Sequence, residues 1–168
     1  MIRARTRHEL PCSPERFWAL YLDVDFIHRA FVEGLRWAPP KILSVTDDGR
    51  IYRRVMEATP NLVLPGPVAK LVNRTLGFTE TGTFDRETQR FTLRHVTNVF
   101  GERVDLGGTF YCEPNPSAGP NACLRIGDLA VEAHIPLVGG LVERAVETNI
   151  HKGWDENAAW LRKVVPTL

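Results

Sequence analysis

The sequence feature that most constrains the fold is the long C-terminal stretch between Pro136 and Pro166, which contains no proline. Along this stretch, apolar and small side chains recur at helical spacing on one face. Acidic residues fall early in it and basic residues late, which is the order that a helix dipole favours. The pattern predicts one long helix over residues 138–165. Its apolar face must be covered by another element.

The chain ahead of this helix has mostly the alternating pattern of β-strands. Residues 2–8 place three arginines on one side and smaller side chains on the other, which indicates a half-buried strand. Further strands are predicted over residues 35–46 (interrupted at Pro39-Pro40), 50–58, 77–84, 90–97, 104–113 and 121–133. Because the connections are short and rich in turn residues, as at Asp47-Asp48-Gly49, we expect an antiparallel meander.

Two short helices are predicted directly after the first strand. Ser13 is a suitable N-cap and Pro14 suits the first helical position, so a helix over residues 14–22 is expected. A second helix is expected over residues 24–33. The predicted fold class is α+β, in the helix-grip arrangement. A curved antiparallel sheet of six to seven strands wraps around the long C-terminal helix, with the short helices at one end.

Composition excludes several classes of protein. The 168 residues fit a single domain spanning 1–168, and 21 basic against 20 acidic side chains argue against a nucleic-acid partner. No apolar run has the length of a signal peptide core or a membrane span, so we expect a cytoplasmic protein. Cys12, Cys112 and Cys123 are odd in number and lack metal-binding spacing, which favours reduced thiols.

The order of elements, with Pro14-Glu15-Arg16-Phe17-Trp18 opening the first helix, resembles the START-like (SRPBCC) superfamily. The segment from Ile135 to Glu143, which contains Pro136-Leu137-Val138-Gly139-Gly140, is similar to an uncharacterised bacterial family within it. The resemblance covers essentially the whole chain. It implies a deep apolar cavity between the sheet and the last helix that binds lipids, sterols, polyketides or other hydrophobic molecules. It implies no catalytic residues.

The sequence contains few motifs that are typical of catalytic sites. There is no nucleophile elbow, phosphate loop or metal-ligand spacing, and the five histidines are scattered, so we expect no metal and no cofactor. His95 shares its predicted strand face with Phe91 and Leu93, and it is either a ligand-orienting acid or base or a satisfied core histidine. His134 and Glu132 are interpreted as rim or solvent groups.

Two carboxylates have the spacing of inward-facing residues. Glu80 has the parity of Phe78, and Asp128 that of Leu124, so both are expected to need a partner such as Arg54 or Arg94. Such a pair would fix a polar head group of a ligand. The alternative is a bulge or strand end that turns the charge outward.

Two segments hint at a cavity. Ala145 and Gly153 are small and Asn149 is polar on the inner face of the last helix, which leaves space beneath it, although close helix–sheet packing explains small residues equally well. The apolar insert 59–76 is predicted to end in one short amphipathic helix. It is either a lid, with transient membrane contact, or a plug of the core.

We therefore expect a protein that binds or transports a small hydrophobic molecule (a lipid, sterol or polyketide-like compound), and not an enzyme. Two alternatives stay open: a cyclase or dehydratase that uses His95 with Glu80 or Asp128, and a protein-interaction module of the chaperone-activator type. The sequence contains no signal for an oligomeric state. The predicted ligand-binding residues are Trp37, Leu71, Phe78, Phe84, Phe91, Leu93, His95, Phe110, Leu124, Leu141, Ala145 and Asn149.

Overall fold

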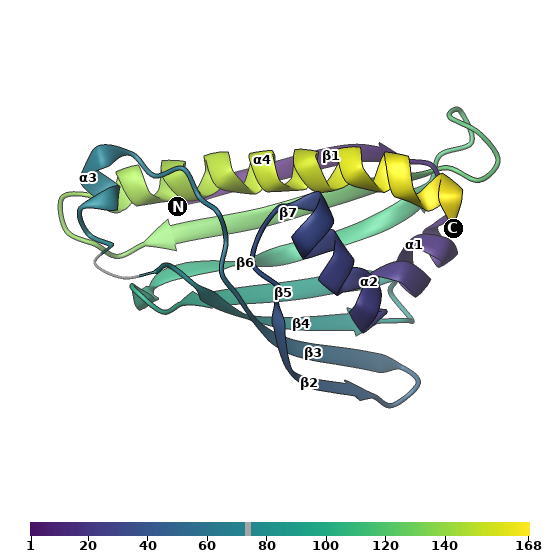
Figure 1. The fold of residues 1–168 in the computed structure, drawn as a ribbon, viewed down its shortest axis with the longest axis horizontal. Coiled ribbons are helices and arrows are strands. Elements are labelled where there is room, and N and C mark those ends of the chain that lie inside the picture. Colours follow the sequence, from purple (N-terminus) through teal and green to yellow (C-terminus); the bar gives the residue numbers. More distant parts are fainter. Residues whose placement is uncertain (73–74) are drawn as a thin grey trace.

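The computed structural model describes residues 1–72 and 75–168 and contains one antiparallel sheet (Figure 1). The order of its seven strands is β1-β7-β6-β5-β4-β3-β2. The strands are β1 (Ile2–Leu10), β2 (Lys41–Asp47), β3 (Ile51–Ala58), β4 (Phe78–Asp85), β5 (Arg90–Thr97), β6 (Gly101–Pro114) and β7 (Cys123–Ala133). The helices are α1 (Pro14–Tyr21), α2 (Val24–Arg29) with the π-helical turn η1 (Ala30–Gly34), α3 (Gly66–Ala69), α4 (Gly139–Val164) and the 3₁₀ turn η2 (Val165–Thr167).

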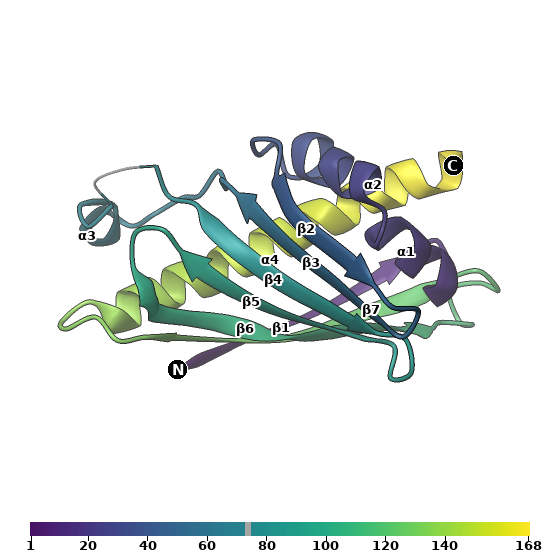
Figure 2. The same cartoon turned by 90° about the horizontal axis from the view of Figure 1, so that it is seen from below.

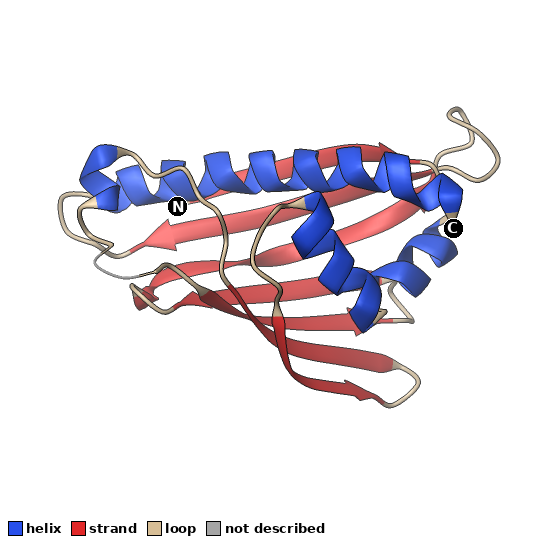
Figure 3. Cartoon of the chain, viewed as in Figure 1, coloured by secondary structure: helices blue, strands red, loops and turns tan. Residues whose placement is uncertain are grey.

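The predicted helix-grip fold is confirmed. Strands β2 to β7 form the meander, and β1 joins its far edge beside β7, so the first two strands of the chain lie at opposite edges of the sheet. Helices α1 and α2 connect these edges at one end of the sheet, and α4 runs along its inner face, closest to β1 and β7 (Figures 1 and 2). Figure 3 shows that the helices lie on one side of the strands.

The two short helices begin as predicted. The Ser13 hydroxyl accepts a hydrogen bond from the Arg16 amide at 3.2 Å, with Pro14 in the first turn. Asp23 caps α2 in the same way, since its carboxylate accepts from the Phe26 amide at 2.7 Å. These local bonds explain why both helix starts could be read from the sequence.

Two predicted boundaries were wrong. Residues 35–40 are not part of a strand, and β2 begins only at Lys41, because consecutive prolines cannot donate the ladder hydrogen bonds. In the insert 59–76, the helix α3 covers only Gly66–Ala69, earlier and shorter than the predicted amphipathic helix. Residues 73–74 of that prediction lie outside the described residues.

The core has two parts. The larger cluster joins α1, α2 and the end of α4 to the sheet and includes Trp18, Phe84, Phe91 and Phe110. The smaller cluster lies at the α3 end and includes Val68 and Val142. Within the described residues, no helix combines the length and the apolar character that crossing a bilayer requires.

Candidate ligand-binding site

A cavity of about 220 Å³ lies beneath α4, and its lining draws on both core clusters. Its walls come from the sheet, the short helices, the insert after β3 and the inner face of α4. Most of these side chains are apolar. The polar or charged residues of the lining include Glu80, His95, Thr97, Arg125, Asn149 and Asn157.

Seven of the twelve predicted ligand-binding residues line this cavity. They are Trp37, Phe78, Leu93, His95, Phe110, Ala145 and Asn149. Gly153, the second small residue of the α4 face, lines it as well. The structure brings these residues together around one space, and their contact with a ligand stays a prediction.

Phe84, Phe91 and Leu124 were predicted at the cavity, and the structure places them elsewhere. Phe84 and Phe91 are buried against aromatic rings of the main core, with the Phe84 ring centroid 4.2 Å from that of Trp18. Leu124 lies on the other face of β7, where its cross-strand neighbours Glu9 and Glu113 are exposed. Phe84 and Phe91 share the inner face with the cavity residues but fill the core at its other end, whereas Leu124 was misassigned because β7 has apolar residues on both faces.

Leu71 and Leu141 also lie outside the cavity lining. Leu71 is 40% exposed and borders a separate hollow together with Phe100 and Ile135. Leu141 packs against the smaller core cluster from the first turn of α4. Leu141 therefore serves packing, whereas Leu71 remains partly exposed on the insert.

The inward carboxylate predicted at Glu80 is confirmed, and it lies between two basic groups. One Glu80 oxygen is 2.9 Å from Nε2 of His95, and the other is 3.4 Å from a terminal nitrogen of Arg54, which is fully buried. Arg54 also donates to the Tyr21 carbonyl oxygen at 3.1 Å. Burial raises the pKa of Glu80, but the hydrogen bonds and charges of His95 and Arg54 outweigh it and hold that pKa below its ordinary value.

The inward placement of Asp128 was wrong. Its side chain is 40% exposed on the outer face, where it pairs with Arg3 at 3.2 Å and Arg5 at 3.8 Å. Arg94, the other suggested partner, is also exposed and pairs with Asp105. Asp128 therefore does not reach His95 across the cavity, which leaves Glu80 as the acidic neighbour.

His134 and Glu132 lie 3.9 Å apart near the end of β7 and are exposed to solvent, and neither lines the cavity. All three cysteines are buried free thiols. No group of three or more His, Cys, Asp or Glu side chains that could hold a metal occurs among the described residues.

The insert after β3 covers one side of the cavity. Leu62 and Leu64 line the cavity, whereas Val63 between them is 70% exposed. The side-chain amide of Asn149 on α4 bonds to both backbone groups of Val63. This contact fastens the described part of the insert to α4.

Sequence reasoning missed a second polar cluster, formed by His8, Arg125 and Asn157. Arg125 is 4% exposed and faces inward on β7, with the parity of Leu129 and Val131. Because the prediction placed Leu124 and Asp128 on the inner face of β7, it left Arg125 on the outer one. Gly127 is small and lies on the same face as Arg125. It was the available signal that this face of β7 is the inner one.

Comparisons with known proteins support the fold. The family model described as "Protein of unknown function (DUF2505)" matches residues 5–165. Among curated proteins, none matches the sequence.

Several solved structures share the fold at low sequence identity. TTHA0849 from Thermus thermophilus has a TM-score of 0.65 at 17% identity, over 99% of this chain and 98% of that one. The Zhui aromatase/cyclase from Streptomyces sp. R1128 has a TM-score of 0.64 at 11% identity, over 98% and 95%. Norcoclaurine synthase from Thalictrum flavum has a TM-score of 0.59 at 18% identity, over 98% and 87%.

Proposed function

The chain belongs to DUF2505, a family of proteins of unknown function, and we propose that it binds a small hydrophobic molecule in the cavity between the sheet and α4. The observation that carries this proposal is the cavity itself: about 220 Å³ remains beneath α4, where Ala145 and Gly153 are too small to fill it. Protein interiors are otherwise packed to the density of organic crystals. A void of this size with apolar walls therefore favours an apolar occupant.

The size of the cavity indicates the scale of the ligand. Pockets for drug-sized ligands span about 300–1,000 Å³, so a compact lipid, sterol fragment or polyketide-like molecule fits best. Affinity comes from apolar area removed from water, at about 25 cal/mol per Å². The few polar groups of the lining orient the ligand. The fold supports this proposal, because the START-like superfamily that the chain resembles holds hydrophobic molecules in this place.

The chain provides its own reporters of binding. Trp37 and Trp154 line the cavity, whereas Trp18 and Trp160 are packed in the core. Delipidated protein titrated with a panel of fatty acids, sterols and aromatic polyketides should show saturable changes in tryptophan fluorescence with at least one class. A panel without any saturable response, together with no co-purified ligand in native mass spectrometry, would refute the proposal.

A cavity-filling variant locates the binding site. A Cβ built at Gly153 meets no atom closer than 3.9 Å, so a larger side chain there extends into the cavity. Gly153→Leu should weaken binding at least tenfold, while the matched control Gly153→Ala retains it. Equal affinities of the two variants would place the ligand elsewhere.

A second candidate function is a cyclase or dehydratase reaction in the same cavity. The observation that favours it is the 2.9 Å contact between His95 and Glu80, both of which line the cavity. With Nε2 of His95 donating to the Glu80 carboxylate, Nδ1 is the ring nitrogen left to accept a proton from a ligand, as a general base. If His95→Gln loses the ability to convert a bound substrate but keeps its affinity for the ligand, the result would support an enzyme over a ligand carrier.

The insert supports a proposed route for the ligand. Val63 and Leu71 expose apolar side chains on the segment that covers the cavity, and contact with a membrane surface would bury them. Co-sedimentation with vesicles that is lost in Val63→Asp would support this route.

The alternative function, a protein-interaction module of the chaperone-activator type, predicted little internal volume. The cavity beneath α4 does not favour that alternative.

A further inference from the structure

Arg125 is a buried cation inside an apolar cavity. It projects from the inner face of β7, is 4% exposed, and is the only arginine or lysine among the described residues that line the cavity. Burying a charge is costly unless an opposite charge accompanies it. A negatively charged partner is therefore expected beside Arg125.

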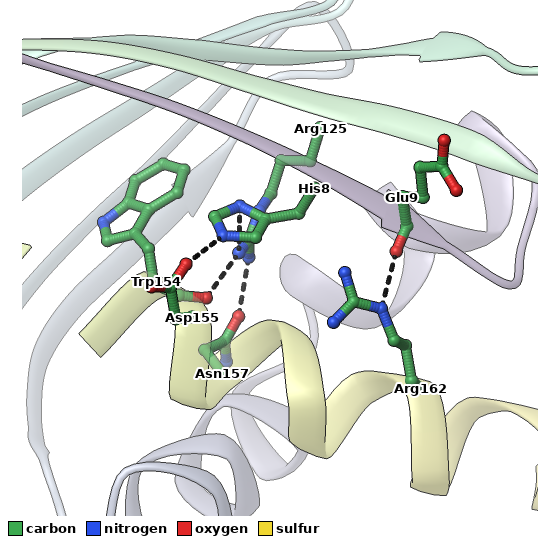
Figure 4. Close-up of polar contacts among 7 residues, drawn as sticks. All are labelled: His8, Glu9, Arg125, Trp154, Asp155, Asn157 and Arg162. Carbon is green, nitrogen blue, oxygen red and sulfur yellow. Dashed lines mark hydrogen bonds and ion pairs between the residues drawn. The ribbon is translucent and has the colours of Figure 1, made fainter. Parts of the chain in front are cut away.

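Its partners within the protein are all neutral (Figure 4). One terminal nitrogen donates to the Asn157 side-chain oxygen at 2.6 Å, and the other donates to the Trp154 carbonyl oxygen at 3.1 Å. The second nitrogen also lies 3.4 Å from Nδ1 of His8, and the indole ring of Trp154 stacks 4.6 Å from the guanidinium carbon. Nε of Arg125 has no partner within residues 1–72 and 75–168.

The carboxylate that contacts this cluster, Asp155, is engaged by His8. Asp155 lies 2.8 Å from Nε2 of His8, and its side chain is 71% exposed. Burial lowers the pKa of His8 and Arg125 lowers it further, which favours a neutral ring that accepts from Arg125 and donates to Asp155. Burial also lowers the pKa of Arg125 to about 10, so the guanidinium is charged at neutral pH.

The contrast with Arg54 shows that the chain can neutralise a buried arginine. Arg54 is fully buried and has the carboxylate of Glu80 at 3.4 Å. At the corresponding place beside Arg125, the side chain is the uncharged amide of Asn157. Among the described residues, no carboxylate forms an ion pair with Arg125.

We propose that Arg125 and Asn157 form an anion subsite inside the cavity, and that the hydrophobic ligand has a carboxylate that pairs with Arg125. This inference rests on the proposed function. A guanidinium has five N–H donors, and the contacts to Asn157, Trp154 and His8 leave two for a ligand. One of them is on Nε, so a ligand carboxylate accepts a charge-assisted hydrogen bond in the plane of the guanidinium and lies beside its positive charge. A dianionic phosphate would need a second cation, which the described lining lacks.

The test compares decanoate with decanol, which have the same chain and differ in charge. At pH 7.5, the wild-type protein should bind decanoate at least tenfold more tightly than decanol, because a charged hydrogen-bonded pair replaces a neutral contact. Arg125→Met should bring the affinity ratio close to one, and Arg125→Lys should restore part of it. Circular dichroism checks that each variant is folded.

A near-isosteric variant decides the question even if Arg125→Met does not fold. Asn157→Asp places a carboxylate at the oxygen that already lies 2.6 Å from Arg125, which supplies the missing counter-charge within the protein. It should raise the melting temperature of the ligand-free protein and bring the decanoate-to-decanol ratio close to one. Asn157→Ala, the matched control without the charge, should not raise the melting temperature.

The outcomes separate this inference from the function on which it rests. Equal wild-type affinities for decanoate and decanol, or a preference for decanoate that survives in Asn157→Asp, would overturn the anion subsite and leave a hydrophobic-ligand function standing. Failure of both probes to bind would also overturn the subsite. The proposed function itself fails only if the complete panel of sterols, fatty acids and polyketides gives no saturable binding.

Discussion

The side-chain amide of Asn149 on α4 forms two hydrogen bonds with the backbone of Val63, which lies 86 residues earlier in the chain. The side-chain oxygen accepts from the Val63 amide at 3.3 Å, and the side-chain nitrogen donates to the Val63 carbonyl at 3.1 Å. The same nitrogen donates to the Ala145 carbonyl at 2.8 Å, which fixes the side chain on the helix. The cover of the cavity is thus held to α4 by one side chain.

Removing this contact should loosen the cover. In Asn149→Ala, we expect amide exchange at Val63 and its neighbours to increase about 30-fold, because two hydrogen bonds that stabilise the closed state by about 1 kcal/mol each are lost. The sheet strands should exchange as in the wild type. Hydrogen-exchange mass spectrometry measures this, with Thr148→Ala as the control on the exposed side of the same turn. Unchanged exchange at Val63 would show that packing alone holds the segment.

Removing the charge of Glu80 should destabilise the protein. Glu80→Gln leaves the fully buried Arg54 without a carboxylate, and breaking a buried ion pair from one side costs about 3 kcal/mol or more. Urea denaturation measures the free energy of unfolding. The control Glu57→Gln removes an exposed carboxylate of β3 that is 3.9 Å from Lys41, and it should leave that free energy essentially unchanged. Equal effects of the two variants would contradict the buried pair.

The stabilising effect of Glu80 should depend on pH in one direction. Its pKa in the folded protein lies below the ordinary value of 4.5, so the ionised carboxylate stabilises the fold fully above pH 4.5, and this contribution is lost as the pH falls through the folded-state pKa. The difference in free energy of unfolding between wild type and Glu80→Gln should therefore be constant near neutral pH and shrink in acid. A difference that stays constant down to pH 3 would contradict the lowered pKa.

Two glycines should respond oppositely to alanine. Gly153 lies in the interior of α4 beside the cavity, and an added Cβ is 3.9 Å from the nearest atom, so Gly153→Ala should stabilise the protein by about 0.5–1 kcal/mol through helix propensity. At Gly127 on β7, an added Cβ would lie 2.6 Å from the Thr6 hydroxyl oxygen and 2.9 Å from the Trp154 ring. Gly127→Ala should therefore destabilise by about 1–3 kcal/mol. Thermal denaturation of both variants checks the pair, and destabilisation by Gly153→Ala would indicate that the space beneath α4 is filled.

The order and type of the elements could be predicted because their signals are local. Ser13 and Asp23 cap helices through bonds to residues three positions away, and the alternation of Phe91, Leu93 and His95 follows from the two-residue repeat of a strand. The proline-free stretch before Pro166 predicted α4 because helical periodicity persists along its whole length. Glu80 was expected to face inward for the same reason, and Arg54 was one of its two suggested partners.

The sequence by itself determined which elements form and which residues share a face, whereas only the tertiary structure decided which face of β7 meets the cavity. Alternation defines two faces of a strand but does not say which one is covered, and β7 has apolar residues on both. The prediction consequently exchanged the faces of Arg125 and Asp128. The contacts of Arg125 with Asn157 and of Asn149 with Val63 join residues 32 and 86 positions apart. Such contacts exist only after the sheet has curved around α4, because no local preference of the chain encodes them.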